Sequence, residues 1–397
     1  MPPTSAPEDG TTMGVEEEFL LACPDTGAAA PRGPQVLARL GDTYDASTPG
    51  AGPRAELLQT MVESATGVCT GLTQLHHHLT TARAHLAATA VGSGTRLLAT
   101  ASPPLPPTSP RSAITGTEHY AEMHHLYGAL TIDQEICSCH VHVGVADRDT
   151  AAAVLNHLRP WLPTLLTLSS NSPYLHGQDT GYASWRTVSL SRWPSVRTPP
   201  YFQDSDHYDR ALQDLRRGGL LSDSSDAHWL ARISSHLPTV EVRVADICHT
   251  VDEAVLQAGL TRALVRTSLH HIAEKRRAPE VSDTTASAAL WTAARHGADG
   301  PALDPVTGDL VPAPQRLEQL FTHIELAATE TGDLEHLRHL AHRVRTGGTG
   351  ATRQRQAHSS GGPAHLIDLL TQQTAAEGPT WKRESPDTRA AADRVTR

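Results

Sequence analysis

The chain has 397 residues, of which 39% are hydrophobic and 19% charged, and its formal net charge at pH 7 is −10. This length supports a large core, in one big domain or two ordinary ones. The acidic balance argues against a nucleic-acid partner, because binding nucleic acid needs a basic surface. Five cysteines, an odd number, do not indicate a disulfide framework. No apolar run approaches membrane-spanning length, and we expect a protein of the reducing cytoplasm.

The two ends of the chain are polar. Residues 1–12 are rich in proline and are predicted to form a disordered leader. They show neither the basic start nor the apolar stretch of a signal peptide. Residues 13–374 are predicted to form one folded domain. Residues 375–397 are charged and contain two prolines, so we expect a flexible tail there.

The first predicted strand covers residues 14–21, an apolar run that ends at a turn over residues 24–27. Alternate side chains of a strand share a face, so Glu16 and Glu18 point one way and Glu17 the other. Two like charges on one face repel each other unless a cation lies between them. A hard divalent cation such as Mg²⁺, which prefers oxygen ligands, fits that position. A solvated edge strand is the alternative.

A further acidic pair, Glu56 and Glu63, lies within residues 54–64. If this segment is a helix, the two carboxylates lie about two turns apart on one face. If it is a strand that leads into a helix, Glu56 joins the sheet face and Glu63 reaches it from the helix start. The pattern leaves both readings open, and a solvated helical face is the alternative to a ligand role.

Residues 137–145, with the sequence CSCHVHVGV, are predicted to form a second strand. His140 and His142 then share one face, while the cysteines and valines share the other. A zinc site built from both residue types is one alternative, but strand alternation directs thiols and imidazoles to opposite faces. A pair of hydrogen-bonded core histidines is another alternative.

Residues 238–246, with the sequence PTVEVRVAD, are predicted to form a third strand. Val240, Val242 and Val244 form a face suited to a core. The opposite face is predicted to carry Thr239, Glu241, Arg243 and Ala245. A strand with Glu and Arg on one face and valines on its back is typical of an active-site floor; an exposed ion pair is the alternative.

Helices are predicted between and after these strands. Residues 72–89 show helical periodicity, and residues 150–169 are predicted to form a helix broken near two prolines. Residues 250–275 are predicted to form a long helix that begins with a capping box. Residues 286–373 are predicted to be helical, with interruptions at a turn over residues 304–305 and a glycine loop over residues 347–350.

Taken together, the motifs resemble the carboxylate–amine ligase family, which includes the type 2 glutamate–cysteine ligases. The resemblance runs from residue 14 to residue 374 and rests on several motifs in the right order. These motifs are GVEEEFLL, ELLQ followed by VESATGVC, CSCHVHVGV, NSPYLHGQDTGYASWR, SRWP, TVEVRVADIC, WTAARHGADG, DPVTG and GTGATRQRQA.

The resemblance implies an α+β fold in which an antiparallel sheet has helices packed on one face, as in the catalytic domain of glutamine synthetase. It implies an enzyme that uses ATP with Mg²⁺ or Mn²⁺ to convert the γ-carboxylate of glutamate into a γ-glutamyl phosphate. An amine, cysteine in the type case, then forms an amide and displaces phosphate. The implied partners are small molecules, with neither nucleic acid nor membrane, and a homo-oligomer is compatible with the family.

The resemblance also implies roles for individual residues. The implied metal ligands are Glu16, Glu18, Glu56, Glu63, His140 and Glu241. The residues implied to act at the phosphate or the substrate are Arg243, His142 and Arg186. The residues implied to bind the nucleotide or another anion are Arg353, Arg355 and Arg192. For Arg186 and Arg192, ordinary surface arginines are the alternative.

One position departs from the family. Relatives tend to carry Trp-Asp-x-Arg before the third strand, whereas this chain has Leu230 in place of the acid and keeps Arg232. We expect Leu230 to remove a polar contact near the amine and to favour a larger, more apolar amine.

Three other functions remain open. One is a ligase that joins glutamate to an amine other than cysteine. The second is a phosphotransferase of the guanidino kinase type. The third is a zinc-binding protein without catalytic activity.

Overall fold

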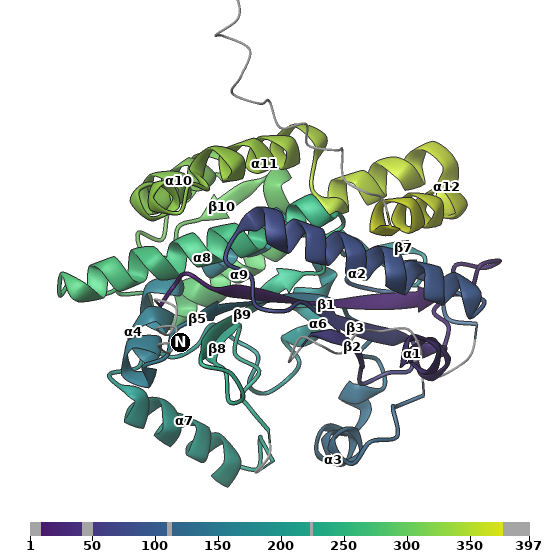
Figure 1. The fold of residues 1–397 in the computed structure, drawn as a ribbon, viewed down its shortest axis with the longest axis horizontal. Helices are drawn as coiled ribbons and strands as arrows, with labels where there is room; N and C mark the ends of the chain where they lie inside the picture. Colours follow the sequence, from purple (N-terminus) through teal and green to yellow (C-terminus); the bar gives the residue numbers. More distant parts are fainter. Residues whose placement is uncertain (1–8, 42–50, 109–112, 223–224, 376–397) are drawn as a thin grey trace, which may run out of the picture.

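The protein is built on a seven-stranded antiparallel sheet, within residues 9–41, 51–108, 113–222 and 225–375 that the computed structural model describes. Helices cover one face of this sheet (Figure 1). The order across the sheet is β2 (Gly52–Ala55), β3 (Met61–Ala65), β1 (Met13–Ala22), β5 (Ser138–Gly144), β9 (Thr239–Asp246) and β8 (Ala231–Ile233), and β4 (Arg96–Leu98) pairs with the end of β1. The predicted α+β fold class is confirmed.

Strand β1 lies in the middle of the sheet and pairs with β3, β4 and β5. Its odd-numbered residues face the helices: Val15 belongs to one buried apolar cluster and Phe19 to a second. Glu17 lies on this same face, whereas Glu16 and Glu18 line a cavity on the other. The predicted alternation of the three glutamates is therefore confirmed.

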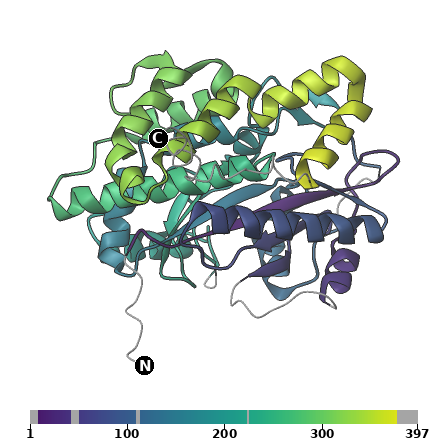
Figure 2. The ribbon, with the colours of Figure 1, turned by 45° about the horizontal axis from the view of Figure 1, so that its top comes forward.

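Two long helices, α2 (Leu72–Gly92) and α8 (Val251–Ala273), run side by side across the covered face (Figure 2). Helix α8 is buried along most of its length because it lies between the sheet and the outer helices. Its predicted capping box is present: Glu253 N–H donates to the Thr250 hydroxyl and Thr250 N–H donates to the Glu253 carboxylate. The predicted break in residues 150–169 separates α4 (Arg148–Leu158) from α5 (Leu162–Ser169).

The remaining elements surround this core. The other helices are α1 (Gly33–Gly41), α3 (Glu118–Tyr127), α6 (Trp185–Leu190), α7 (Ser205–Arg217), α9 (Asp283–His296), α10 (Ala313–Glu330), α11 (Leu334–Gly347) and α12 (Gly350–Ala375), with short 3-10 turns η1 (Gly128–Thr131) and η2 (Gly297–Asp299). Two small hairpins are formed by β6 (Tyr174–Leu175) with β7 (Gln178–Asp179), and by β10 (Pro301–Leu303) with β11 (Leu310–Pro312). Among the described residues no helix is long and apolar enough to cross a membrane.

Three segments differ from the sequence predictions. Residues 54–64 form no helix: they leave β2, turn, and return as β3 beside β1. The hairpin β10–β11 interrupts the predicted C-terminal helices around the turn at residues 304–308. Near the start, Gly10 N–H donates to the Gly144 carbonyl at 2.7 Å, so the chain already contacts the sheet there. Residues 1–8 of the predicted leader and 376–397 of the predicted tail lie outside the described residues.

A buried ion pair joins β1 to α2 beneath the sheet. Arg83 donates to the Glu17 carboxylate from Nε at 2.9 Å and from Nη2 at 2.5 Å. The same guanidinium donates to the backbone carbonyls of Cys248 and His249 at 2.8 and 3.2 Å. The two side chains are 1% and 2% exposed. Because both charges are removed from water, each depends on the other for its stability.

We expect Arg83→Met to lower the free energy of unfolding by about 3–5 kcal/mol, because it leaves the Glu17 charge buried without a partner. The double variant Glu17→Leu/Arg83→Met removes both charges and should lose less than the single variant. Urea denaturation of the metal-free proteins measures both. A single variant that is as stable as the wild type would show that the ion pair does not stabilise the fold.

Candidate active site

The uncovered face of the sheet forms the floor of a cavity of about 760 Å³. This volume lies in the range of pockets that enclose small ligands. Strands β1, β3, β5 and β9 supply the floor, and segments near α3, α6 and β8 supply the walls. The polar floor residues are Glu16, Glu18, Glu63, His140, His142, Glu241 and Arg243, joined by Glu56 from the segment after β2.

The potential metal ligands fall into two groups. The first group is Glu16, His140 and Glu241, and the second group is Glu18, Glu56 and Glu63. Within each group, one ligand atom from every residue lies within 4.8 Å of the others. Strand register explains this arrangement: Glu16 is opposite His140 on β5, and Glu18 is opposite Glu63 on β3. All six predicted ligands therefore lie together in one cavity.

The second group concentrates negative charge. Burial raises the pKa of Glu56 well above its ordinary value, and the charges of Glu18 and Glu63 raise it further. Burial, together with Glu16 and Glu18, raises the pKa of Glu63 to about 7. Arg54 contacts Glu63 at 3.3 Å from the cavity edge. Oxygen ligands held in such excess of negative charge fit a hard divalent cation.

The first group has its own positive partners. Burial raises the pKa of Glu241, but Arg243 and Arg232 lower it more, so that it lies below its ordinary value. Arg232 donates to Glu241 from Nε at 2.7 Å, and Arg243 also donates to this carboxylate. Burial likewise raises the pKa of Glu16, but hydrogen bonds and charges of His140 and His142 outweigh it. Both carboxylates are therefore ionised at neutral pH.

The two histidines of β5 differ in their surroundings. Burial and the charge of Arg243 lower the pKa of His140. This favours the neutral imidazole, the form that binds metals. Burial lowers the pKa of His142, but Glu16 and Glu241 raise it more. The His142 Nδ1 atom lies 2.9 Å from the Thr239 hydroxyl. His140 thus suits a ligand role, and His142 suits a contact with a negative group.

A β-bulge sets the position of Arg243. Cys139 of β5 is opposite Ala245 of β9, but Val141 is opposite Val242, so one extra residue lies on β9 between these pairs. The bulge turns Ala245 into the apolar core, and the prediction that it shares the face of Glu241 is wrong. Such insertions bend a strand and redirect its side chains.

Arg186 lies beneath this bulge and not in the cavity wall. Its guanidinium donates to the carbonyls of Arg243 and Val244 at 2.9 and 3.1 Å and to the Ser138 hydroxyl at 2.9 Å. It also lies 3.6 Å from Asp246, and it is 2% exposed. Because its donors are used inside the protein, Arg186 supports the backbone that carries Arg243 and does not reach a substrate.

The three arginines predicted to bind the nucleotide lie away from the cavity. Arg353 donates to Glu253 at 2.5 Å, and Arg355 donates to Asp179 through two bonds of 2.8 Å. Both belong to α12, which packs on the helix-covered side of the sheet (Figure 1). Arg192 is exposed and donates to the carbonyl of Ser189. The prediction that these arginines surround the nucleotide is therefore corrected.

Leu230 also differs from its predicted place. Its side chain is 5% exposed and belongs to the first apolar cluster, next to Trp229 and Ala231. It does not line the cavity, so it makes no contact with an amine there. Arg232, in the middle of β8, does line the cavity, whereas its strand neighbours Ala231 and Ile233 belong to the first apolar cluster, as alternation along a strand requires.

Several residues of the cavity wall were not predicted from the sequence. Arg54 lies opposite Glu63 on β2 and contacts both Glu16 and Glu63 at 3.3 Å. Tyr120, Gln134 and Trp193 line the other side. The alternation of the β2 strand could have indicated Arg54, but no local pattern marks the other three.

The zinc alternative receives no support from the thiols. Cys139 is buried in the first apolar cluster, and Cys137 in the second. Within the described residues, neither group of potential metal ligands contains a cysteine. The predicted separation of thiols from imidazoles is confirmed.

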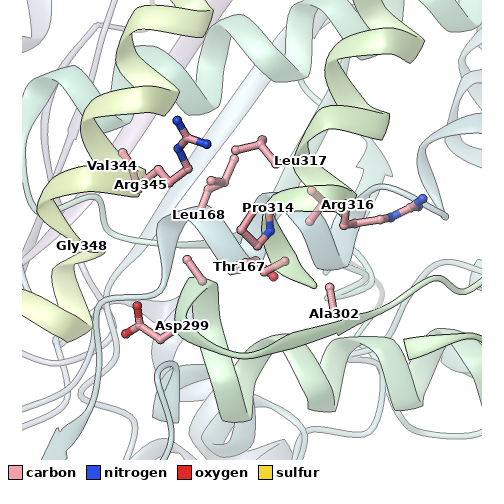
Figure 3. A pocket seen from close by; sticks show the side chains of 13 residues that line it. Thr167, Leu168, Asp299, Ala302, Pro314, Arg316, Leu317, Val344, Arg345 and Gly348 are labelled. Atoms are coloured by element: carbon pink, nitrogen blue, oxygen red, sulfur yellow. The ribbon is translucent and has the colours of Figure 1, made fainter. Parts of the chain in front are cut away.

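A second hollow, of about 50 Å³, lies between α5, α10 and α11 (Figure 3). Its wall is mostly apolar and includes Leu168, Pro314 and Leu317. It contains none of the potential metal ligands and is far smaller than the cavity over the sheet. The chemistry is therefore assigned to the larger cavity.

Comparisons with known proteins agree with this geometry. The model of the family "Glutamate-cysteine ligase family 2" matches residues 12–379. The chain belongs to this family. A protein of Saccharopolyspora erythraea, provisionally named glutamate–cysteine ligase 2-2, is 45% identical over 371 residues, which cover 92% of this chain and 93% of the relative. A provisionally named glutamate–cysteine ligase 2 of Salinispora arenicola is 40% identical over 376 residues, covering 94% and 98%.

Among solved structures, the chain is similar to a glutamate–cysteine ligase of Francisella tularensis in complex with AMP. The TM-score is 0.64 at 15% identity, and the alignment covers 94% of this chain and 91% of that one. Identity at this level shows the fold, which is the glutamine synthetase-like fold expected from the sequence. The family match confirms the predicted enzyme class, an ATP-dependent carbon–nitrogen ligase.

We expect Glu63→Gln to stabilise the metal-free protein at pH 8 by up to about 3 kcal/mol and to lose this advantage near pH 5. The folded-state pKa of Glu63 is raised from 4.5 to about 7. The contribution of protonated Glu63 to the free energy of unfolding is fully present below pH 4.5, and it is lost as the pH rises through 7. Glutamine does not titrate, so it avoids this loss.

Urea denaturation in EDTA at several pH values gives this difference, with the exposed Glu335→Gln as the matched control. Adding Mg²⁺ should stabilise the wild type more than Glu63→Gln, because the variant has lost one anionic ligand. A gain that is equal at pH 5 and pH 8 would show that repulsion among the carboxylates is not its cause.

Proposed function

We propose that this protein joins the γ-carboxylate of glutamate to an amine in an ATP-dependent reaction that passes through γ-glutamyl phosphate. The observation that carries the proposal is the pair of ligand groups in one cavity, one of them bordered by arginines. Phosphoryl transfer depends mainly on positioning and on neutralising charge. A site with two groups of oxygen and imidazole ligands beside cationic side chains meets both needs.

The two groups would each hold a divalent cation, Mg²⁺ or Mn²⁺. In the second group the donors are three carboxylates with an excess of negative charge, and in the first they are two carboxylates and a neutral imidazole. Both donor sets suit a hard cation better than zinc, which favours sulfur and nitrogen ligands. The bound ions would supply neutralisation of the phosphate charge.

The arginines would position the transferring phosphoryl group. Arg243 and Arg232 hold Glu241 from two sides and both line the cavity. Their planar guanidinium groups can bind phosphate oxygens in pairs. Arg54, at the opposite edge, lies over Glu16 and Glu63 and can bind a phosphate or carboxylate that enters between the two groups.

The reaction has two steps. A γ-carboxylate oxygen of glutamate attacks the γ-phosphorus of ATP, and the bond to ADP breaks. The lone pair of the uncharged amine then attacks the acyl carbon, the amine loses a proton, and phosphate leaves with the acyl C–O bonding electrons. The residues of the cavity hold the two substrates and neutralise charge during both steps.

A guanidino kinase-like phosphotransferase is the second candidate, because it uses the same cavity and the same nucleotide. It would place phosphate on the second substrate and would form no amide. The family membership favours the ligase. We place the reaction in the cytoplasm, where the five free thiols remain reduced. A homo-oligomer stays a prediction of the sequence.

We expect turnover to require Mg²⁺ or Mn²⁺, and Glu18→Gln or Glu241→Gln to lower kcat by at least about 100-fold. Each variant replaces an anionic ligand from a different group and leaves phosphate charge under-neutralised. Release of ADP in the presence of glutamate and an amine measures turnover. Circular dichroism establishes that the variants fold.

Two control variants accompany this experiment. Glu335→Gln makes the same chemical change at an exposed residue of α11 and should retain wild-type turnover. Cys139→Ala alters β5 on its core face and should cost stability but little activity. Full activity in either ligand variant would remove that residue from the metal site.

We expect hydroxylamine to trap γ-glutamyl phosphate as glutamyl hydroxamate when ATP, Mg²⁺ and glutamate are present. Hydroxylamine is a small nucleophile that attacks the acyl carbon without needing the pocket of the natural amine. Ferric chloride detects the hydroxamate, and omission of ATP is the control. Phosphate found on the second substrate, with no hydroxamate, would favour the phosphotransferase.

A further inference from the structure

The two ends of the cavity differ in the polarity of the side chains that line them. One end lies at the start of β1, beside Gly14 and Gly144. The other end, which we call the apolar end, lies where β3 and β5 begin. Six residues of the cavity form its apolar wall: Leu57, Met61 and Trp193 of the second cluster, with Tyr120, Met123 and Leu190 packed against them.

Two buried polar side chains in the wall of the apolar end lack partners. Gln134 is 5% exposed, and neither its amide nitrogen nor its amide oxygen has a hydrogen-bond partner among the described residues. Trp193 is 4% exposed, and its indole N–H has no acceptor among them. Both residues line the cavity. Buried polar groups are almost always paired, so a bound ligand is expected to pair these two.

Two aromatic rings pack against Trp193. Its ring lies 4.6 Å from the Tyr127 ring and 5.4 Å from the His228 ring. Burial, with the charges of Arg243 and Arg232, lowers the pKa of His228 to about 3. His228 is therefore neutral at physiological pH. Trp193 and His228 both line the cavity, with Tyr127 behind them, so this part of the wall offers flat, uncharged rings on which an aromatic or apolar group packs well.

The position of the apolar end favours the amine over the nucleotide. Ser138 N–H donates to Glu18 at 2.7 Å where β5 begins, and the Tyr120 hydroxyl donates to the Ala55 carbonyl, next to Glu56. The apolar end therefore borders the second group. The arginines that suit a phosphate chain, Arg232 and Arg243, hold Glu241 of the first group, and they approach the apolar end only on the side of His228.

We propose that the apolar end binds the amine substrate, and that this amine carries an aromatic or apolar body with one neutral hydrogen-bonding group, recognised by Gln134 and Trp193. The proposal rests on the ligase function proposed above. Gln134 can donate and accept, and the indole N–H can donate, so a hydroxyl or an amide on the ligand pairs with both. Cysteine is too small to cover this wall and offers no neutral oxygen to it.

The test uses two amines that differ by one hydroxyl group. Tyramine has an aromatic ring and a neutral hydroxyl, and phenethylamine lacks the hydroxyl. With ATP, Mg²⁺ and glutamate, mass spectrometry of the amide gives kcat/KM for each amine and for cysteine. We expect tyramine to exceed phenethylamine about tenfold, as one or two neutral hydrogen bonds allow, and both to exceed cysteine.

Two variants assign this preference to the residues. Gln134→Leu and Trp193→Phe keep the apolar surface and remove the polar atoms, so the ratio of tyramine to phenethylamine should fall toward one. The exposed residues Gln178 and Trp291 provide matched controls, Gln178→Leu and Trp291→Phe, in which the ratio should stay at the wild-type value. The ratio is measured within each variant, so partial misfolding does not change it.

Three results of these measurements would overturn the assignment of the apolar end to the amine. A wild-type preference for cysteine, or a ratio unchanged in both variants, overturns the proposal. A higher KM for ATP with an unchanged ratio would assign the apolar end to the nucleotide base and would also overturn it. The hydroxylamine reaction separates this from failure of the ligase function: hydroxamate formation without the expected amine preference rejects only the inference, and absence of hydroxamate in the wild type rejects both.

Discussion

The placement of three carboxylates on one face of the sheet, within reach of a single ion, is the constraint on which the site depends. Glu18 and Glu63 are opposite each other in neighbouring strands, and Glu56 reaches them from the next turn. Burial raises the pKa of both Glu56 and Glu63, and the charges of neighbouring carboxylates raise it further. Packing elsewhere in the folded chain maintains this unfavourable arrangement of carboxylates. A cation that binds between them stabilises the folded protein, because the unfolded chain does not hold the three together.

The opposite face of the same strands provides that packing. Glu17 lies between Glu16 and Glu18 in sequence, yet it points to α2, where Arg83 neutralises it and ties β1 to the segment between β9 and α8. On the far side of β9, Arg186 fixes the bulge that carries Arg243. Two buried arginines outside the cavity therefore set the positions of residues that line it. Changes at either one are expected to act on the site through the backbone.

The sequence predicted the parts of the site that depend on local alternation. Glu16, Glu18, His140, His142 and Glu241 follow from strands of period two, and their faces were predicted correctly. The predictions that depended on contacts distant in sequence were less successful. The family resemblance implied a nucleotide role for Arg353 and Arg355, but the packing of α12 directs them to Glu253 and Asp179. Ala245 was misplaced because a bulge, which depends on the partner strand, changes the alternation within one strand.

The contrast between the two ends of the cavity also bears on the second step of the proposed reaction. An ammonium ion cannot attack an acyl phosphate, so the amine must lose a proton before it reacts. An apolar wall lowers the pKa of an amine, because desolvation disfavours its charged form, whereas nearby carboxylates raise it. The same wall limits the access of water, which competes with the amine for an activated acyl group. An amine body that covers Trp193 and Leu190 would exclude water from the cavity at the moment when the acyl phosphate is present. In the proposed reaction, the apolar end would thus connect the choice of amine to the protection of the intermediate.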